Sequence, residues 1–349
     1  MTSLAERVDV VIGVDTHKHT HTAAVIDAGT GGALAELTVP TDAGGYLRLL
    51  DWAGQHGTGR VWAIEGAGGY GAGLVRFLTA AGEQVTELDR PVRAARRNGA
   101  RSDALDAVRA AREALARPHL AQVKTDGPRA ELAVLLAARR SAVDAATIAQ
   151  RQLHAMVTAA PEGLRTLFRG QSTTVMVATA ARLRSRASWD RHTATTAGVL
   201  RTLARRAQDL GAEAQTHERA ITDIVRAWRP DLLHQTGVGP IVAAQVLTAW
   251  SHPGRVRSEA AFAMLAGVAP IPASSGLRTR HRLNRSGDRQ LNRALHVIAL
   301  SRARYDPRTR DYIERRRAQG KTDREIRRCL KRYIARDLFR QLEHGQLPA

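Results

Sequence analysis

Short apolar runs alternate with turn residues along the N-terminal part of the chain, a pattern that predicts a mixed α/β domain. The apolar runs that predict strands fall at 8–14, 22–27, 34–39, 61–65 and 84–88. Only turn residues separate the first three runs, which therefore predict an antiparallel meander. The segments predicted to be helical follow the meander and alternate with the later strands, at 45–52, 71–81 and 91–117.

The pattern changes near residue 126, where strand signals end and apolar residues recur every three or four positions. Runs rich in Ala, Leu and Arg at 128–158 and 195–228 predict two long helices, with a break near Pro161–Gly163. We expect residues 119–232 to form a helical spacer. Two interpretations stay open for it, a coiled coil or a plain helical domain without a role in oligomerisation.

Residues 233–349 have a third kind of composition. The sequence TGVGP opens a region of short helices, 270–289 is predicted to be a polar and basic loop, and 290–340 is strongly helical and very basic. The predicted fold class is therefore α/β followed by α. Three parts are expected, at 1–118, 119–232 and 233–349.

The charge of the chain points to polyanionic partners. Its 349 residues include 53 Lys and Arg against 33 Asp and Glu, a formal net charge of +20. A field of this strength favours polyanions and speeds encounter with them. Most of the basic residues are arginine, whose planar fork binds phosphate through two hydrogen bonds, although a GC-rich genome would give the same bias.

Cysteine usage and hydropathy fit a cytoplasmic protein. The single cysteine, Cys329, excludes an intrachain disulfide and fits a reducing compartment. The N-terminal segment carries early acidic residues and no long apolar core, so no signal peptide is expected. No apolar run approaches the roughly 20 residues that a membrane span needs, so no membrane association is expected.

Four acidic residues fall where one fold could gather them. Asp15 and Glu65 each end an apolar strand, and Asp103 and Asp106, three residues apart, share one face of a helix. Two carboxylates about 4 Å apart repel by about 4 kcal/mol at an effective dielectric of 20, so a site that collects them needs cations. Mg²⁺ suits oxygen ligands, and two such ions can hold both reacting oxygens of a phosphodiester.

The order of these elements is that of RNase H-like and RuvC-like domains, in which such acids form a metal site. Alternatively, each acid is solvated, or Asp103 and Asp106 pair with arginines of their own helix. His17, His19 and His21 alternate after Asp15 and would share one face of a strand, where they could bind a transition metal. Without a fourth ligand, surface histidines are the preferred interpretation.

Gly66, Gly68 and Gly71 form a GxGxxG pattern between a strand and a helix, which is also typical of dinucleotide-binding domains. We disfavour that interpretation because the pattern begins at the fourth strand, after a meander. Glycines here let the backbone pass close to a phosphate or to Glu65. Lys18 could contact phosphate near the acids.

Two features of the last part suggest contacts to phosphate. Gly237 and Gly239 in TGVGPIVAAQVL resemble the hairpin of a helix-hairpin-helix element, although a simple helix-start turn fits equally well. A serine pair, Ser274 and Ser275, precedes a glycine, and a serine hydroxyl can attack a phosphodiester. The arginines that follow it could stabilise charge on phosphorus, namely Arg278, Arg280, Arg282 and Arg285.

These motifs together resemble a family of bacterial insertion-sequence enzymes. GVDTHK, AIEGAGGYG and RSDALDA carry the four acids as its DEDD domain does, and TGVGPIVAAQVL, FAMLAGVAPIPASSG and RLNRSGDRQLNRALH match its second domain. The family comprises the bridge-RNA-guided recombinases, which are similar to pilin-gene invertases. The resemblance covers nearly the whole chain, with the spacer matching in length and character only. One departure is Ala67, where the family often has a small hydroxyl residue.

The resemblance implies a fold, a reaction and partners. It implies a RuvC-like domain, a coiled-coil linker and a serine transposase domain, with Mg²⁺ at Asp15, Glu65, Asp103 and Asp106. It places the nucleophile at Ser275, with Ser274 as the fallback. It also implies donor and target DNA, a structured guide RNA, and a homo-oligomer, a dimer assembling to a tetramer, that acts at the nucleoid.

Three functions remain to be separated. A recombinase would need both the acids and the serine. A RuvC-like endonuclease that uses metal-activated water to cut junctions would need the acids only. A non-catalytic nucleic-acid-binding protein would need neither, although the complete set of four acids speaks against it.

Overall fold

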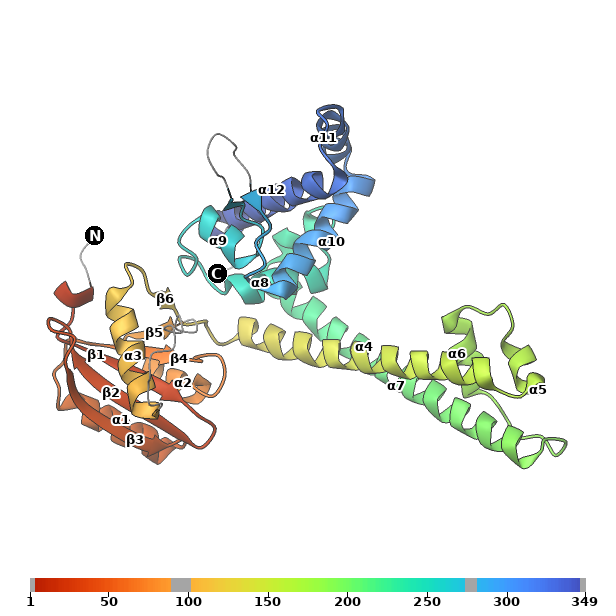
Figure 1. Ribbon diagram of the computed structural model, residues 1–349, viewed down its shortest axis with the longest axis horizontal. Helices are drawn as coiled ribbons and strands as arrows, with labels where there is room; N and C mark the ends of the chain where they lie inside the picture. The colour runs from red at the N-terminus through yellow and green to blue at the C-terminus, as the bar shows by residue number, and fades with distance from the viewer. Residues whose placement is uncertain (1–3, 89–101, 274–280, 346–349) are drawn as a thin grey trace. The chain divides into compact units, whose positions relative to one another are not determined.

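The computed structural model describes residues 4–88, 102–273 and 281–345 (Figure 1). The chain divides into two compact units, Met1–Lys124 and Thr125–Ala349, each with its own core. In the described ranges, no helix combines the length and apolar character needed to cross a membrane.

The first unit is built on a six-stranded sheet with the order β3-β2-β1-β4-β5-β6. β1 pairs antiparallel with β2, and β2 with β3, whereas β1–β4 and β4–β5 are parallel. The predicted meander and the alternation that follows it are thus confirmed, and a doubly wound parallel sheet is excluded. The strands are β1 Val10–Thr16, β2 Thr20–Asp27, β3 Ala33–Pro40, β4 Arg60–Glu65, β5 Val85–Leu88 and β6 Ala121–Gln122.

The sequence did not predict β6, a two-residue strand that pairs antiparallel with β5. So short a segment carries no periodicity, and only its partner defines it as a strand. The predicted helix over 91–117 is observed as α3, Asp103–Ala116. Residues 91–101 of that prediction lie outside the described residues.

Helices cover both faces of the sheet, with α1 (Ala43–Gly54) and α2 (Ala72–Ala80) on one and α3 on the other (Figure 1). Successive side chains of β1 point to opposite faces of the sheet. Ile12 and Val14 are buried on the side of α1 and α2, and Val11 is buried on the side of α3. Central strands buried on both faces explain the unbroken apolar runs in the sequence.

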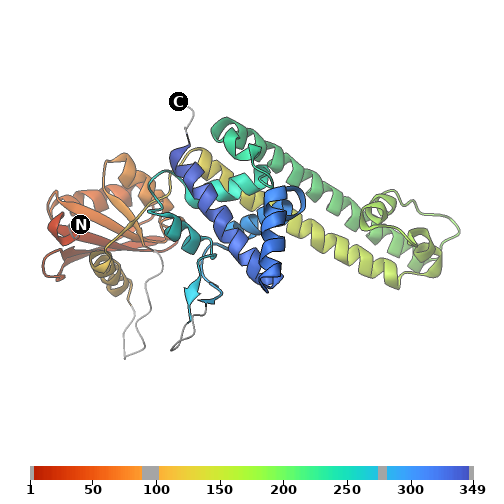
Figure 2. The same ribbon diagram turned by 90° about the horizontal axis from the view of Figure 1, so that it is seen from above.

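The second unit begins with a hairpin of two long helices, α4 (Pro128–Ala159) and α7 (Arg191–Trp228), which lie side by side (Figure 2). Both predicted helices are confirmed, and α4 ends just before the predicted break. Buried positions along α7 recur in steps of three, four or seven, the spacing of a heptad repeat. They include Ala197, Leu200, Ala204, Ala207, Ala214, Ile221 and Val225.

Small helices that the sequence did not predict occupy the tip of the hairpin. They are α5 (Glu162–Arg165), the 3₁₀ segment η2 (Thr166–Phe168) and α6 (Thr173–Ala181). Phe168 and Met176 pack with Leu153 and Leu200 of the long helices, so the tip has its own small core.

The rest of the second unit is mainly helical, as predicted. Trp250, Phe262, Leu295 and Leu338 are fully buried in one core, although the surfaces of the last helices are basic. The predicted loop at 270–289 contains two short strands that pair with each other. The elements are η3 Pro230–His234, α8 Pro240–Trp250, α9 Glu259–Leu265, β7 Ile271–Pro272, β8 His281–Arg282, α10 Arg289–Tyr305, α11 Pro307–Ala318 and α12 Asp323–His344.

Candidate metal centre and basic pocket

Asp15 and Glu65 lie at the ends of two neighbouring parallel strands. The register of β1 and β4 pairs Val14 with Ile64, so the next residue of each strand is one of the two acids. The hydroxyl of Thr16 donates to the carbonyl oxygen of Glu65 at 2.9 Å and ties the two strand ends together. Both predicted acids are therefore at one edge of the sheet.

Two glycines of the GxGxxG pattern have structural roles beside these acids. Gly66 turns the chain directly after Glu65 with a φ of +71°, a conformation that L side chains rarely adopt. A Cβ on Gly71 would lie 3.1 Å from side-chain carbons of both Ile64 and Thr16. The pattern thus shapes the turn next to Glu65 and need not indicate a dinucleotide.

Gly13 brings α3 close to β1. A Cβ at this position would lie 2.0 Å from the carbonyl oxygen of Ala107 and 2.6 Å from the amide nitrogen of Ala111. Asp15, two residues further along the strand, is on the same face as Gly13. Asp103 is one helical turn before Ala107, so this contact carries the start of α3 toward Asp15.

The first turn of α3 holds the other two acids. The Ser102 hydroxyl caps this helix by accepting the amide of Leu105 at 3.2 Å. A helix N-terminus stabilises negative charge, which favours Asp103 and Asp106 at these positions. Asp106 also accepts a hydrogen bond from Arg109 at 2.7 Å, so the pairing of an acid with its own helix is observed for this residue.

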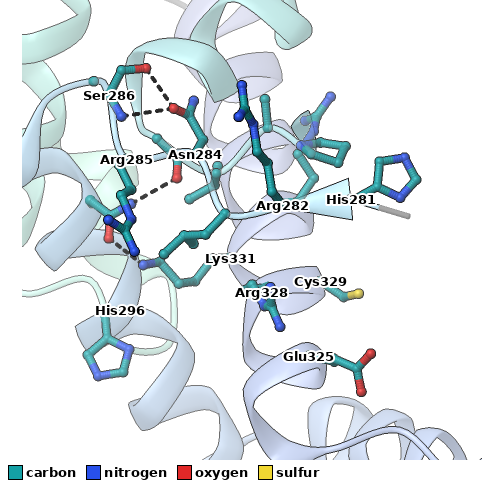
Figure 3. A pocket seen from close by; sticks show the side chains of 18 of the residues that line it. His281, Arg282, Asn284, Arg285, Ser286, His296, Glu325, Arg328, Cys329 and Lys331 are labelled. Carbon is teal, nitrogen blue, oxygen red and sulfur yellow. Dashed lines mark hydrogen bonds between the residues drawn. The ribbon is translucent and has the colours of Figure 1, made fainter. Parts of the chain in front are cut away.

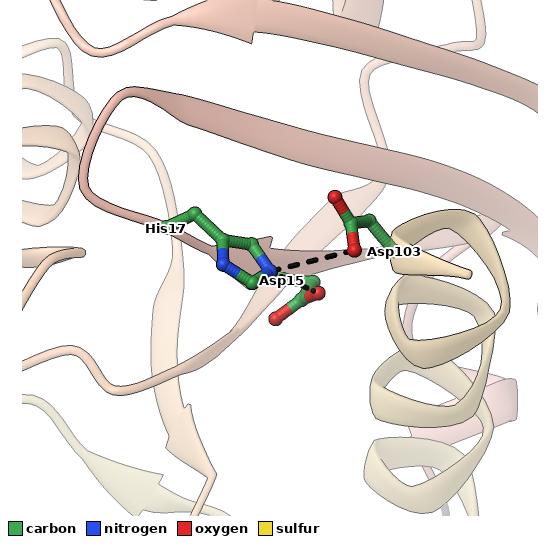
Figure 4. Close-up of side chains that lie close together, drawn as sticks. All are labelled: Asp15, His17 and Asp103. Carbon is green, nitrogen blue, oxygen red and sulfur yellow. Dashed lines mark hydrogen bonds and ion pairs between the residues drawn. The ribbon is translucent and has the colours of Figure 1, made fainter. Parts of the chain in front are cut away.

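A histidine joins Asp15 and Asp103, as Figure 4 shows. Nε2 of His17 lies 3.0 Å from Oδ2 of Asp15 and 3.5 Å from Oδ1 of Asp103. Potential ligand atoms of these three residues lie within 4.8 Å of one another, and no other such group of three occurs among the described residues. Glu65 and Asp106 lie at adjoining positions outside this group.

The three alternating histidines therefore do not act as a set. His17 and His19 are exposed, as the preferred interpretation had it, but His21 is completely buried. The ring of His21 stacks on Tyr46 with centroids 5.9 Å apart. Sequence reasoning did not select His17 as a site residue, although its position two residues after Asp15 was the available signal.

The electrostatics of this group favour a bound cation. Burial raises the pKa of Asp15 above its ordinary value, and the charges of Asp103 and Asp106 raise it further, while the hydrogen bond with His17 lowers it. A divalent cation would offset this repulsion between carboxylates. The donor set of two carboxylates and one imidazole fits such an ion, with Glu65 and Asp106 near enough in the fold to be candidates.

Three other residues, Lys18, Gly237 and Gly239, are predicted to contact phosphate. Lys18 is exposed between β1 and β2, where its carbonyl oxygen accepts from the Thr41 hydroxyl at 3.0 Å. Gly237 has a φ of +85°, and a Cβ there would lie 2.9 Å from Ser301, so close packing against α10 accounts for this glycine. Gly239 is the N-cap of α8 and has open space around it. Contacts of these residues with phosphate stay predictions.

Four residues of the predicted nucleophile segment lie outside the described residues, namely Ser274, Ser275, Arg278 and Arg280. The described chain on either side forms β7 and β8, in which Pro272 pairs with His281. Arg282 and Arg285 line a cavity of about 1070 Å³ in the second unit, shown in Figure 3. Two of the four predicted arginines are thus placed together.

Two protein families match this chain. A DEDD transposase family of the IS110 type matches residues 12–160, which include all four acids. The family described as "Transposase IS116/IS110/IS902 family" matches residues 231–314, which include the segment around Ser275. Both matched families are transposase families of insertion sequences, and each match covers less than half of the chain. Over these two segments the matches agree with the resemblance to insertion-sequence enzymes, and the first match supports the RNase H-like interpretation of the sheet.

Two curated proteins that are similar to part of this chain come from insertion elements. The chain is 35% identical over 117 residues to the "Insertion element IS110 uncharacterized 43.6 kDa protein" of Streptomyces coelicolor, covering 33% of this chain and 29% of that protein. It is 36% identical over 92 residues to the "Insertion element IS900 uncharacterized 42 kDa protein" of Mycobacterium paratuberculosis, covering 26% and 23%. Each alignment thus spans less than a third of the relative.

Proposed function

We propose that this chain cuts and rejoins DNA strands as the transposase of an insertion element. The observation that carries the proposal is the meeting of Asp15, Asp103 and His17 at one end of the central strand, within the segment matched by the DEDD family. Glu65 and Asp106 complete the proposed ligand set from the neighbouring strand and the same helical turn. The net charge of +20 suits a DNA substrate.

Mg²⁺ is the cation we propose, because carboxylate oxygens dominate the ligand set. Bound there, it would supply positive charge to the oxygens of a scissile phosphodiester. Within the chain itself, His17 fixes the orientation of the Asp15 carboxylate through their 3.0 Å contact. Lys18, in the same turn, would contact the DNA backbone.

The nucleophile we propose is Ser275, with Ser274 as the alternative, on the strength of the family resemblance. In this step the serine oxygen bonds to phosphorus and one deoxyribose oxygen leaves, taking up a proton to become a hydroxyl. A sugar hydroxyl of a second strand then displaces the serine, which regains its proton. Arg278, Arg280, Arg282 and Arg285 would stabilise the charge on phosphorus.

The proposed partners are donor and target DNA and a structured guide RNA. We also propose a homo-oligomer, a dimer that assembles to a tetramer, in which the acids of one subunit act with the serine of another. The heptad spacing along α7 supports a coiled coil within the spacer. The RNA rests on the family resemblance only.

Covalent trapping tests the proposal directly. Full-length protein is incubated with labelled cognate DNA, its RNA and Mg²⁺, then denatured, and protein–DNA adducts are counted. The adduct should disappear in Ser275→Ala, or in Ser274→Ala if the other serine acts, and should persist in Ser141→Ala, an exposed serine of α4. An adduct that survives the substitution of both Ser274 and Ser275 refutes the serine mechanism.

A metal-dependent endonuclease that uses water is the second candidate, favoured by the close grouping of Asp15, His17 and Asp103. It predicts cleavage with free ends, no adduct, and full activity in the double serine variant. If Asp15→Asn changes neither metal binding nor strand breakage, both enzymatic proposals fail and a non-catalytic nucleic-acid-binding protein remains.

A further inference from the structure

The cavity of about 1070 Å³ in the second unit is strongly basic. Its walls come from α10, α12, the end of α11 and the segments 267–270 and 281–288. Both acids that line it are engaged in capping: Asp288 accepts backbone amides at the start of α10, and Glu325 accepts from Thr322 at the start of α12. The cationic residues outnumber them and include Arg282, Arg285, Arg293, Arg328, Lys331 and Arg332.

Lys331 is the least usual of these cations. It is half-buried, and its Nζ donates to Oδ1 of Asn292 at 2.5 Å (Figure 3 shows the lysine). No carboxylate pairs with it in the described ranges, and burial lowers the pKa of this ammonium. An ammonium has three donors, so two of them remain for another acceptor.

Asn292 holds this ammonium in a fixed position. Its Nδ2 donates to the carbonyl oxygens of Ala266 at 2.7 Å and Gly267 at 3.3 Å, which leaves Oδ1 for Lys331. Gly267 packs closely against the next loop, because a Cβ there would lie 2.6 Å from the carbonyl oxygen of Ser286. The position of the charge is therefore built into the packing of this loop.

Further donors beside Lys331 have no acceptor. Nη1 of Arg332 and Nε of Arg316 are buried without a hydrogen-bond partner among the described residues. Both residues line the cavity. Burial lowers the pKa of His296, which also lines the cavity, and the charges of Lys331 and Arg327 lower it further. Buried donors nearly always have partners, so these atoms indicate an acceptor that completes the site.

We propose that this cavity binds a backbone phosphate of a nucleic-acid strand, held by the Lys331 ammonium and the Arg332 guanidinium. A phosphate supplies the negative charge and the several acceptor oxygens that these donors lack. The proposal rests on the proposed function for the identity of the strand. It assigns a role to Lys331 and Arg332 of α12, in the cavity that Arg282 and Arg285 also line.

The only cysteine of the chain gives a direct assay of this cavity. Cys329 lines it and is partly exposed, so alkylation of full-length protein by the uncharged reagent N-ethylmaleimide reports access to the site. Pyrophosphate, a 20-nucleotide DNA and the matching RNA serve as probes in separate arms. We expect each probe that enters to slow alkylation several-fold, and the DNA and RNA arms to identify the strand.

Lys331→Met should abolish this protection, whereas Arg324→Met should retain it. Arg324 is exposed on the same helix and does not line the cavity, so the control removes an equal charge. The loss of a charge-assisted contact should weaken oligonucleotide binding roughly tenfold to hundredfold. The slope of log K against log salt should fall by about 0.9 for duplex or about 0.7 for single strands.

Arg332→Gln is a second, independent variant in case Lys331→Met fails to fold, and it should show the same loss. Equal protection and equal salt slopes in the two α12 methionine variants would overturn the inference. Oligonucleotide binding that leaves Cys329 fully reactive would overturn it too, while sparing the proposed function. Protection by pyrophosphate without any binding of DNA or RNA would support the phosphate site and contradict the proposed function.

Discussion

Substitution of Gly13 tests how the metal centre is assembled. The candidate ligands Asp15 and Asp103 come from elements far apart in the sequence, and the contact of Gly13 with α3 brings them together. In Gly13→Ala the new Cβ would lie 2.0 Å from the carbonyl oxygen of Ala107. Carbon–oxygen contacts normally exceed about 3.3 Å, so the helix must move by about 1 Å.

Two effects of known size follow from this displacement. Overpacking of a core costs about 1–3 kcal/mol, and here the obstacle is backbone that cannot rotate away. The Asp103 carboxylate would move with its helix by a similar amount. Metal ligands must lie within about 0.2 Å of their proper distances, so we expect affinity for a divalent cation to fall by about two orders of magnitude.

Urea unfolding and isothermal titration with Mn²⁺ measure the two effects separately. Gly54→Ala is the matched control, because Gly54 ends α1 and a methyl group added there would have nothing within 4 Å. It should leave metal affinity unchanged and stability unchanged or slightly higher. Wild-type metal affinity in Gly13→Ala would refute the reasoning that this contact positions Asp103.

Other predictions concern pH and buried charge. The pKa of Asp15 is raised in the folded protein, so the folded state binds the proton more tightly than the unfolded state, and stability falls as pH rises from about 3.8 through the raised value. Thermal unfolding measured in EDTA should show this loss of stability with rising pH in the wild type and not in Asp15→Asn. The same pH profile in both proteins would contradict the prediction. Arg229 is completely buried against Asp231 and donates to the carbonyl of Gln341, so Arg229→Ala should lower stability by about 3–5 kcal/mol in urea unfolding. Arg340→Ala, which breaks an exposed pair, should cost less than about 1 kcal/mol, and equal losses would disprove the role of burial.

The elements with strong periodicity could be predicted from the sequence, and those defined by their partners could not. The strands ending at Asp15 and Glu65 and the long helices of the spacer follow from apolar runs and three–four spacing. β6 and the small tip helices carry no such pattern, because a long-range pairing or a local core defines them. Three-residue spacing placed Asp103 and Asp106 on one helical face, and the strand order placed Asp15 near them.

The sequence was a poorer guide to which side chains meet. His17 joins Asp15 and Asp103 from the turn that follows β1, a detail that no spacing rule encodes. Asp106 instead pairs with Arg109. No sequence pattern distinguishes Lys331 from the many other cations of the chain. Its ammonium is held in place by Oδ1 of Asn292, whose amide is oriented by two backbone carbonyl oxygens, and this contact is visible only in the structure.

The length of the spacer hairpin has a mechanical consequence. α7 has 38 residues, which at 1.5 Å per residue gives a rod of about 57 Å. Along this rod buried alanines pack against α4, and we expect the two paired helices to move as one arm. A rotation of about 6° at its base would carry the tip helices about 6 Å. That is more than the 3.4 Å rise of one base pair, so a small change at the base of the arm becomes a step of more than one base pair at its end.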